Sequence, residues 1–249
     1  MKSQARRPLD HSTVKYSLVK HPDLFVGYKT GPIADVKDVS IWVNSENEDM
    51  IMDRFIGRTI SANIRYLGAD RDQADNVTED IINEELISAV GPRGPVRIGT
   101  VIETSPGALA VTHGVKAILH VATVKGVGAG QGVRVDLDDI ARCTRNVLVK
   151  AHNKNRRFLL AERFKRFSLI NRLLKRKNCE SILIPMIGAG DGGMHVDKVV
   201  PKLMSAAIKY FQEYPTTTLK EIYFLAFTAG HKSACDRELE RLRKQGAIQ

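Results

Sequence analysis

The stretch SILIPMIGAGDGG, residues 181–193, combines the features that decide the fold. Residues 181–187 form a nearly continuous apolar run, which is typical of a β-strand buried on both faces. Four glycines follow within six residues, and glycine permits positive φ angles and close approach of the backbone to a ligand. A helical pattern begins at Val196. A buried strand, a glycine-rich loop and a helix, in this order, are typical of an open α/β sheet that binds its ligand at the carboxyl ends of the strands.

The rest of the chain alternates patterns of the same two kinds. Short apolar runs predict β-strands, and apolar residues at intervals of three and four predict helices. We expect strands at 24–28, 39–43, 98–104, 116–124 and 221–227, and helices at 55–67, 78–90, 137–151, 196–211 and 233–244. This alternation predicts a parallel sheet core with both faces covered.

The chain is organised around one domain. Residues 1–20 begin with a basic, polar stretch that lacks the apolar core of a secretion signal, and we expect a short tail there. Residues 21–249 suit one domain with an insertion. No apolar stretch reaches membrane-spanning length. The three cysteines are widely spaced and form no Cys-x-x-Cys pair, which indicates reduced thiols in a cytoplasmic protein.

The net charge of +10 belongs to one segment. Residues 150–178 contain eleven Lys or Arg and one acidic residue, whereas the other 220 residues hold 27 basic and 27 acidic ones. Apolar residues at helical spacing line one side of this segment: Leu160, Phe164, Phe167, Ile170 and Leu174. We therefore expect a basic amphipathic helical insertion. Either its apolar face docks on the domain and its charges are solvated, or it binds nucleic acid, anionic lipid or an acidic protein.

The glycine-rich loop is the first candidate binding site. Free backbone N–H groups in such a loop and at the following helix start form a cradle for phosphate, whereas the alternative is a loop that only turns tightly. No Lys-Ser/Thr pair follows the glycines, so the loop is not of the Walker type. Asp191 would repel phosphate if it pointed inward. We expect it to point outward or to accept hydrogen bonds from the loop.

A second polar cluster, Asn44-Ser45-Glu46-Asn47, ends an apolar strand. Asparagine side chains bind ribose hydroxyls and backbone groups without adding charge. The alternative is an Asn-rich turn that caps itself.

In order and spacing these segments resemble the macro domain family, whose members bind ADP-ribose. The family's Gly-Asp-Ile turn matches Gly31-Pro32-Ile33, and its Asn-Ala-Ala-Asn matches residues 44–47. Its threonine-glycine stretch and Ile-His strand resemble GTVIETSPGAL and AILHVATV, and its second phosphate loop resembles IPMIGAGDGG. The resemblance covers roughly residues 24–239 apart from the insertion. It implies a three-layer α/β/α fold with a mixed, mostly parallel central sheet.

The resemblance also implies a ligand site. Ile33 would lie beside the adenine with Phe227 stacked on it, and Asn47 would contact the distal ribose. The diphosphate would be wrapped, mainly by backbone N–H groups, by Gly188, Ala189, Gly190, Asp191, Gly192 and Gly193. The implied function is binding of ADP-ribose, a related nucleotide or an ADP-ribosylated protein in a cleft at the strand ends. We expect no cofactor and no metal site.

Two departures from the family bear on specificity and chemistry. Pro32 stands where the family's Asp recognises the adenine amino group, and Asp35 is a nearby carboxylate that could substitute. Residues 48–55 contain no glycine, although the family has a glycine run there that positions water and the distal ribose in hydrolytic members. Arg54 could give a phosphate a charged partner. These departures favour a binding protein. The alternative is an ADP-ribosyl hydrolase or O-acetyl-ADP-ribose deacetylase in which Asp53 or a ligand phosphate activates water.

The histidines add little chemistry. We expect His120, on an apolar strand, to be a hydrogen-bonded core residue, and His195 is a less favoured ligand contact. No histidine pairs with acids at metal-ligand spacing. The sequence contains no nucleophile elbow and no evident pair of catalytic carboxylates, so it assigns no catalytic residue.

Overall fold

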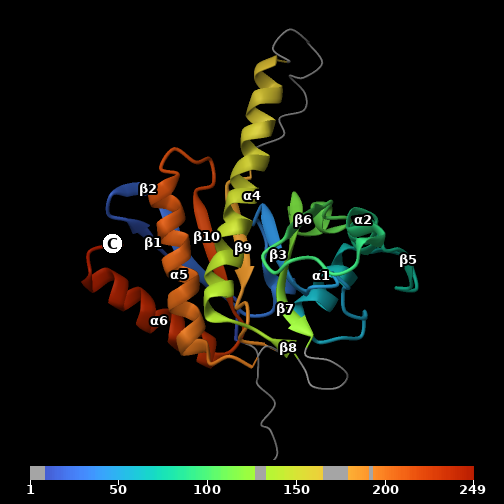
Figure 1. Cartoon of the computed structure of the whole chain (residues 1–249), viewed down its shortest axis with the longest axis horizontal. Helices are drawn as coiled ribbons and strands as arrows, with labels where there is room; N and C mark the ends of the chain where they lie inside the picture. The colour runs from blue at the N-terminus through green and yellow to red at the C-terminus, as the bar shows by residue number, and fades with distance from the viewer. Residues whose placement is uncertain (1–8, 127–132, 165–178, 191–192) are drawn as a thin grey trace, which may run out of the picture.

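A mixed sheet forms the centre of the protein, as Figure 1 shows for the computed structural model, which describes residues 9–126, 133–164, 179–190 and 193–249. Its strands follow the order β1-β2-β10-β9-β3-β7-β6. Their bounds are β1 (Thr13–Leu18), β2 (His21–Thr30), β10 (Glu221–Ala226), β9 (Ser181–Pro185), β3 (Ile41–Asn47), β7 (Ala117–Gly126) and β6 (Val101–Thr104). The five central strands are parallel, whereas β1, β6 and the short β8 (Val133–Arg134) pair antiparallel at the margins. The predicted mixed, mostly parallel sheet is confirmed.

Helices cover both faces of the sheet. The larger ones are α1 (Ile60–Gly68), α2 (Ile81–Val90), α4 (Leu137–Phe164), α5 (Val196–Glu213) and α6 (Ala229–Lys244). The short ones are α3 (Leu109–Thr112) and two 3-10 turns, η1 (Ile33–Asp35) and η2 (Gly91–Arg93). Helices α4, α5 and α6 pack on one face, and α1 and α2 pack on the other over β3 and β6. This is the expected three-layer arrangement.

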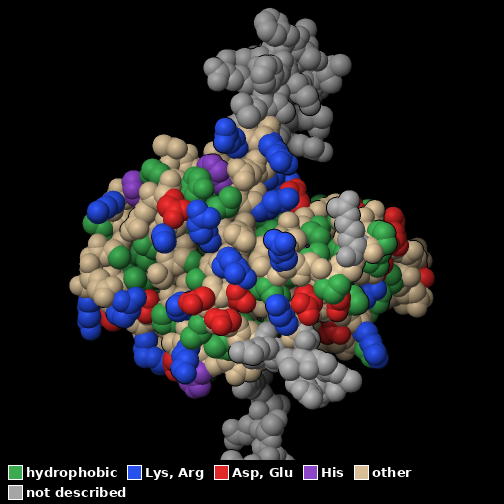
Figure 2. Space-filling view, in the orientation of Figure 1, with side chains coloured by type: hydrophobic (Ala, Val, Ile, Leu, Met, Phe, Trp, Pro, Cys, Tyr) green, Lys and Arg blue, Asp and Glu red, His purple; other side chains and the backbone are tan. Residues whose placement is uncertain are grey.

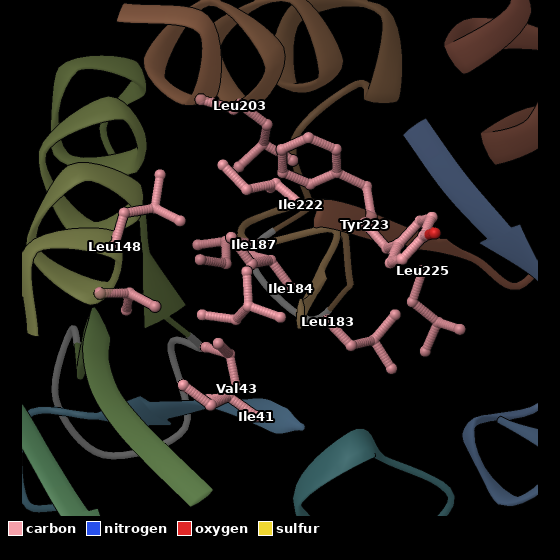
Figure 3. Close-up of a cluster of buried hydrophobic side chains, with 14 of the residues drawn as sticks. Ile41, Val43, Leu148, Leu183, Ile184, Ile187, Leu203, Ile222, Tyr223 and Leu225 are labelled. Carbon is pink, nitrogen blue, oxygen red and sulfur yellow. The ribbon is translucent and has the colours of Figure 1, made fainter. Parts of the chain in front are cut away.

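The core lies where the central strands meet both helical layers. Every residue of β9 is buried, as its apolar run predicts. Figure 3 shows Leu148 of α4 and Leu203 of α5 facing Ile184 and Ile222 across the interior. All four side chains are fully buried. Burial of this kind contributes about 1.5–3 kcal/mol per large aliphatic side chain and anchors the loops that leave the strand ends.

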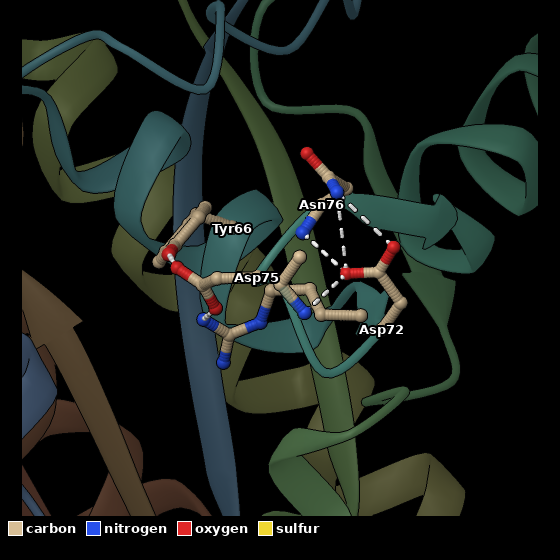
Figure 4. A network of polar contacts seen from close by, with 6 residues as sticks. Tyr66, Asp72, Asp75 and Asn76 are labelled. Carbon is tan, nitrogen blue, oxygen red and sulfur yellow. Dashed lines mark hydrogen bonds and ion pairs between the residues drawn. The ribbon is translucent and has the colours of Figure 1, made fainter.

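A small hairpin joins α1 to α2. It pairs β4 (Asp70–Arg71) with β5 (Val77–Glu79). The Asp72 carboxylate accepts the Asn76 N–H at 2.9 Å and the Asn76 side-chain amide at 3.1 Å, while Asp75 accepts the Tyr66 hydroxyl (Figure 4). The hairpin is thus held by its own polar side chains.

The structure corrects the expected N-terminal tail. Residues 13–18 form β1, which pairs antiparallel with β2, so the ordered sheet begins inside the segment assigned to the tail. Residues 1–8 lie outside the described part of the chain. The sequence did not predict β1 because a polar strand at a sheet edge has few apolar residues of its own and is stabilised by hydrogen bonds to the neighbouring strand.

Two helices differ from the expected ranges by five residues or more at one end. Helix α1 begins at Ile60, not at Phe55, because the Thr59 side chain accepts the Ala62 N–H and caps the helix there. Helix α4 is one continuous helix from Leu137 to Phe164, so the first part of the basic segment extends it. The expected apolar face of this segment falls on side chains outside those described.

Candidate functional site

Four neighbouring parallel strands end at one edge of the sheet, in the order β2, β10, β9, β3. Each end carries a residue from the sequence analysis: Ile33 follows β2, Phe227 follows β10, Gly188 follows β9 and Asn47 ends β3. Three interstrand spacings of roughly 4.8 Å give this row a span of about 14 Å. We call it the carboxyl edge. It brings together residues from four distant parts of the chain.

The loop after β9 has the backbone geometry of an anion site. Gly188 has a φ of 84°, and a Cβ atom there would lie 2.9 Å from the Ile140 Cδ1 of α4, so the position favours glycine. Gly188 is buried, yet within the described residues neither its N–H nor that of Gly190 donates a hydrogen bond. Buried amides are normally paired, so the Gly188 amide, which precedes a helix start, suits an anionic ligand, whereas Gly190 is exposed.

The remainder of this loop is partly described. Ala189 is half-buried and its N–H donates to the Met186 carbonyl at 3.0 Å, whereas the Gly193 N–H donates to Gly190 at 3.0 Å. The amides of Ala189 and Gly193 therefore hold the loop's own turns. Asp191 and Gly192 lie outside the described residues.

The β2 and β10 ends supply the two residues assigned to adenine. Ile33 is buried in η1, and Phe227 is half-buried directly after β10. Because β2 and β10 pair in parallel register up to Thr30 and Ala226, these two residues leave adjacent strands at the same level. Asp35 is exposed, and its N–H donates to the Pro32 carbonyl at 3.1 Å.

Asn47 holds the turn that follows β3. Its Oδ1 accepts the Asp49 N–H at 2.9 Å and the Ile51 N–H at 3.3 Å, and its Nδ2 donates to the Ile51 carbonyl at 3.2 Å. The self-capping alternative is therefore present in the structure. A side-chain amide has two N–H donors, so one donor of Asn47 is left for a ligand.

The loop from Glu48 to Thr59 is held by side chains. The Asp53 carboxylate accepts the Thr59 hydroxyl at 2.7 Å and the Arg54 N–H at 2.7 Å. The Asp53 carbonyl accepts from Arg65 at 2.9 Å, and its N–H donates to Ser61 at 3.0 Å. Asp53 is thus occupied in shaping the loop. Arg54 itself is exposed.

A buried polar chain lies beneath this loop. The Asn44 amide donates to Glu46 Oε1 at 2.7 Å and to His120 Nδ1 at 3.2 Å, and His120 Nε2 bonds the Thr104 hydroxyl at 3.0 Å. Burial lowers the pKa of His120 to about 3, so the ring is neutral. The interpretation of His120 as a hydrogen-bonded core residue is confirmed. Asn44 is fully buried among these side chains, three residues before the end of β3.

Glu46 is the site-proximal residue that sequence reasoning missed. It is 4% exposed and accepts the Ser61 hydroxyl at 2.5 Å, which joins β3 to the start of α1. Burial raises the pKa of this carboxyl to about 7, although bonds from Ser61 and Asn44 act in the opposite direction. Strand alternation could have revealed the burial of Glu46. Trp42, Asn44 and Glu46 are alternate residues of one strand and therefore lie on the same buried face.

His195, the less favoured ligand contact, is exposed at the start of α5. His195 precedes α5 with its side chain 72% exposed, 3.3 Å from Asp197. Among the described residues, no group of three or more His, Cys, Asp or Glu side chains is arranged to hold a metal ion. Within the same residues, no helix has the length and apolar character needed to cross a membrane.

A separate basic surface lies on the C-terminal half of α4. A hollow of about 310 Å³ is lined there by Glu103, Lys150, Asn153, Lys154 and Arg157. Lys154 pairs with Glu103 at 2.5 Å, whereas no described carboxylate pairs with Lys150 or Arg157. Figure 2 shows Lys and Arg side chains gathered around the upper part of α4. Ile140 lies beside Gly188, and Arg157 is 17 residues further along the same helix. The basic surface at Arg157 is therefore about 25 Å from the glycine loop along α4.

Comparison with solved structures identifies the fold. The chain is similar to an Oceanobacillus iheyensis macrodomain solved with ADP, with a TM-score of 0.62 and 17% identity, over 95% of this chain and 100% of that chain. It is also similar to a Trypanosoma brucei macrodomain in complex with ADP-ribose, with a TM-score of 0.57 and 14% identity, over 95% of this chain and 75% of that chain. A scan against protein-family models and a search of curated proteins found no match to the sequence. The chain therefore has the macrodomain fold that the sequence analysis predicted.

Proposed function

We propose that this macrodomain-fold protein binds ADP-ribose, free or attached to a modified protein, along its carboxyl edge. The observation that carries the proposal is the order of the strand ends. The residues assigned to adenine follow β2 and β10, those assigned to the diphosphate follow β9, and the residue assigned to the distal ribose ends β3. Adenine, diphosphate and distal ribose are connected in this same order in ADP-ribose. Near the middle of the row, the amides of Gly188 and Gly190 donate no hydrogen bond within the described part of the chain, which supports a diphosphate site there.

Binding without hydrolysis is the form of the proposal that the contacts support best. A carboxylate that activates water needs a free oxygen near the bond to be broken. Asp53 already accepts from Thr59 and from the backbone of Arg54, and Glu46 is buried. The hydrolase or deacetylase alternative would require loop 48–59 to rearrange on binding. Turnover of an ADP-ribosylated protein or of O-acetyl-ADP-ribose, abolished by Asn47→Ala, would favour that alternative.

Calorimetric titration with ADP-ribose, AMP and NAD tests the proposal. We expect ADP-ribose to bind most tightly, because AMP lacks the second phosphate and the distal ribose, and NAD carries a nicotinamide at the β3 end. Absence of binding by all three ligands would contradict the proposal and leave the glycine loop with a structural role alone.

A second candidate function is binding of nucleic acid through the basic surface on α4. Lys150 and Arg157 are two cations without a described acidic partner, beside Lys154 and the amide of Asn153. Contacts with two or three phosphates predict an affinity for duplex DNA that falls with salt on a log–log slope of about −2 to −3. The double variant Lys150→Glu, Arg157→Glu should remove this binding and leave ADP-ribose affinity unchanged. Salt-independent binding, or binding of an acidic protein in place of nucleic acid, would contradict this function.

We also propose a cytoplasmic location. Cys143, Cys179 and Cys235 are free and buried, which fits a reducing compartment.

A further inference from the structure

A segment before β1 crosses the adenine end of the carboxyl edge. We call residues 9–12 the strap. The Thr30 N–H donates to the Ser12 carbonyl at 2.9 Å, and the Thr30 hydroxyl donates to the Asp10 carbonyl at 2.5 Å. On the other side, the Leu9 N–H reaches the Phe227 carbonyl at 3.4 Å. The strap therefore bridges the ends of β2 and β10, the two strands that carry the adenine residues.

The fold is built to accept this strap. Gly31 has a φ of 92°, and a Cβ atom there would lie 2.9 Å from the Leu9 carbonyl oxygen. Thr30 is 1% exposed, and its hydroxyl lies between the Asp10 carbonyl and the Ser12 hydroxyl, the latter at 2.8 Å. The strap is held in position by this close backbone contact and by the buried Thr30, which bonds Asp10 and Ser12.

The strap also offers the chemistry that the β2 turn lacks. Pro32 has no side-chain acceptor for an amino group, although it stands beside Ile33 at the adenine end. Asp10 is exposed, and its backbone is fixed at the end of β2. Among the described residues no hydrogen bond or ion pair engages its carboxylate, which can therefore accept an N–H donor. Asp35 is the rival carboxylate, but it lies at the far end of η1, and none of its described contacts reaches β10.

We propose that the strap is the outer wall of the adenine site and that the Asp10 carboxylate accepts the adenine amino group in place of an acceptor at position 32. The inference rests on the proposed binding of ADP-ribose. The Asp10 contact would make the protein selective for 6-aminopurine nucleotides, although the strap precedes the parallel strands of the core.

The test compares ADP-ribose with an analogue that carries unsubstituted purine in place of adenine. Calorimetry should show that Asp10→Ala weakens ADP-ribose about tenfold, the loss expected for one hydrogen bond to a charged group, and leaves the analogue unchanged. The exposed Asp70→Ala in the β4–β5 hairpin is the matched control and should bind both ligands as the wild type does. Asp35→Ala should also bind both ligands as the wild type does.

A second variant tests the wall. Thr30→Val keeps Asp10 but removes the hydroxyl that holds the strap, so amide exchange of residues 10–12 should accelerate and the affinity for both ligands should fall. If exchange accelerates while both affinities stay constant, the strap is not part of the site.

The failures are distinguishable. If the wild type binds neither ligand, the proposed function falls and the inference falls with it. If the wild type binds ADP-ribose and Asp10→Ala binds it equally well, or if Asp35→Ala alone loses discrimination, only the inference is overturned.

Discussion

The loops that follow β9 and β3 leave neighbouring strands at the same edge, yet they are built in opposite ways. The β9 loop is shaped by glycine backbone, and two of its amides are unpaired among the described residues. The β3 loop is shaped by Asn47, Asp53 and Thr59, whose polar groups bind the loop itself. Backbone amides that are already in position bind an anion with little reorganisation, whereas side chains in mutual contact must be shared or released. Under the proposed function, we therefore assign ligand affinity to the β9 loop and the shape of the edge to the β3 loop.

Replacement of Gly188 by valine should have the largest effect. The positive φ costs about 1–3 kcal/mol for a side-chain-bearing residue, and the contact with Ile140 adds about 1–3 kcal/mol of overpacking. We expect a loss of roughly 4 kcal/mol in denaturant unfolding and no measurable ADP-ribose binding. Gly190→Ala is the control, because no atom lies within 4 Å of a Cβ there. Equal damage from both variants would contradict the backbone-shaped view of this loop.

Glu46→Gln should change how stability depends on pH. The pKa of Glu46 is raised from 4.5 to about 7 by burial, so the folded state holds a proton that the unfolded state has released between those values. The contribution of protonated Glu46 to the free energy of unfolding is therefore complete below about pH 4.5. It is lost as pH rises through 7, and the loss is about 3 kcal/mol at most. Glutamine does not titrate, so the variant should unfold with a flatter pH profile and gain relative stability at pH 8. Parallel profiles for variant and wild type from pH 4.5 to 8 would show that Glu46 does not titrate in this range.

Asn47→Ala should have a smaller effect on both stability and binding. It removes three hydrogen bonds that close the β3 turn, and we expect a loss of about 1–2 kcal/mol in unfolding and roughly tenfold in ADP-ribose affinity. Asn76→Ala in the hairpin of Figure 4 is the control, because it removes turn bonds far from the carboxyl edge. It should lower stability without changing affinity. Unchanged affinity in Asn47→Ala would remove Asn47 from the ligand site.

Thr59→Val should have the smallest effect. The change removes the α1 cap and the Asp53 partner, which costs about 1 kcal/mol. Thermal unfolding measures this loss, and stopped-flow binding should show a changed dissociation rate if loop 48–59 touches the ligand. Thr112→Val, which loses the bonds of the Thr112 hydroxyl to the Ala108 carbonyl and to His113 Nδ1, should leave the binding kinetics unaltered. Identical kinetics in both variants would place the loop outside the binding event.

Much of the fold was predictable because its signals are local. The apolar run at 181–187 predicted β9, which ends at Pro185, and the glycines after it predicted the loop. Polar strands gave weaker signals, so β1 was assigned to a tail. In the site, Glu46 was missed because its neighbours in sequence suggested a polar turn. Its carboxylate is covered by Ser61 of α1, and its strand pairs with β7 in the sheet.

The strand–loop–helix alternation, the glycine positions and the location of the charge can be read from the amino-acid order alone, because they depend on neighbouring residues and on the period of apolar side chains. The folded chain was needed to show which loops share an edge, that the strap spans β2 and β10, and that Asp53 and Asn47 are engaged in their own loop. Those outcomes depend on strand order and on hydrogen bonds between residues far apart in the chain, and neither leaves a local pattern in the sequence.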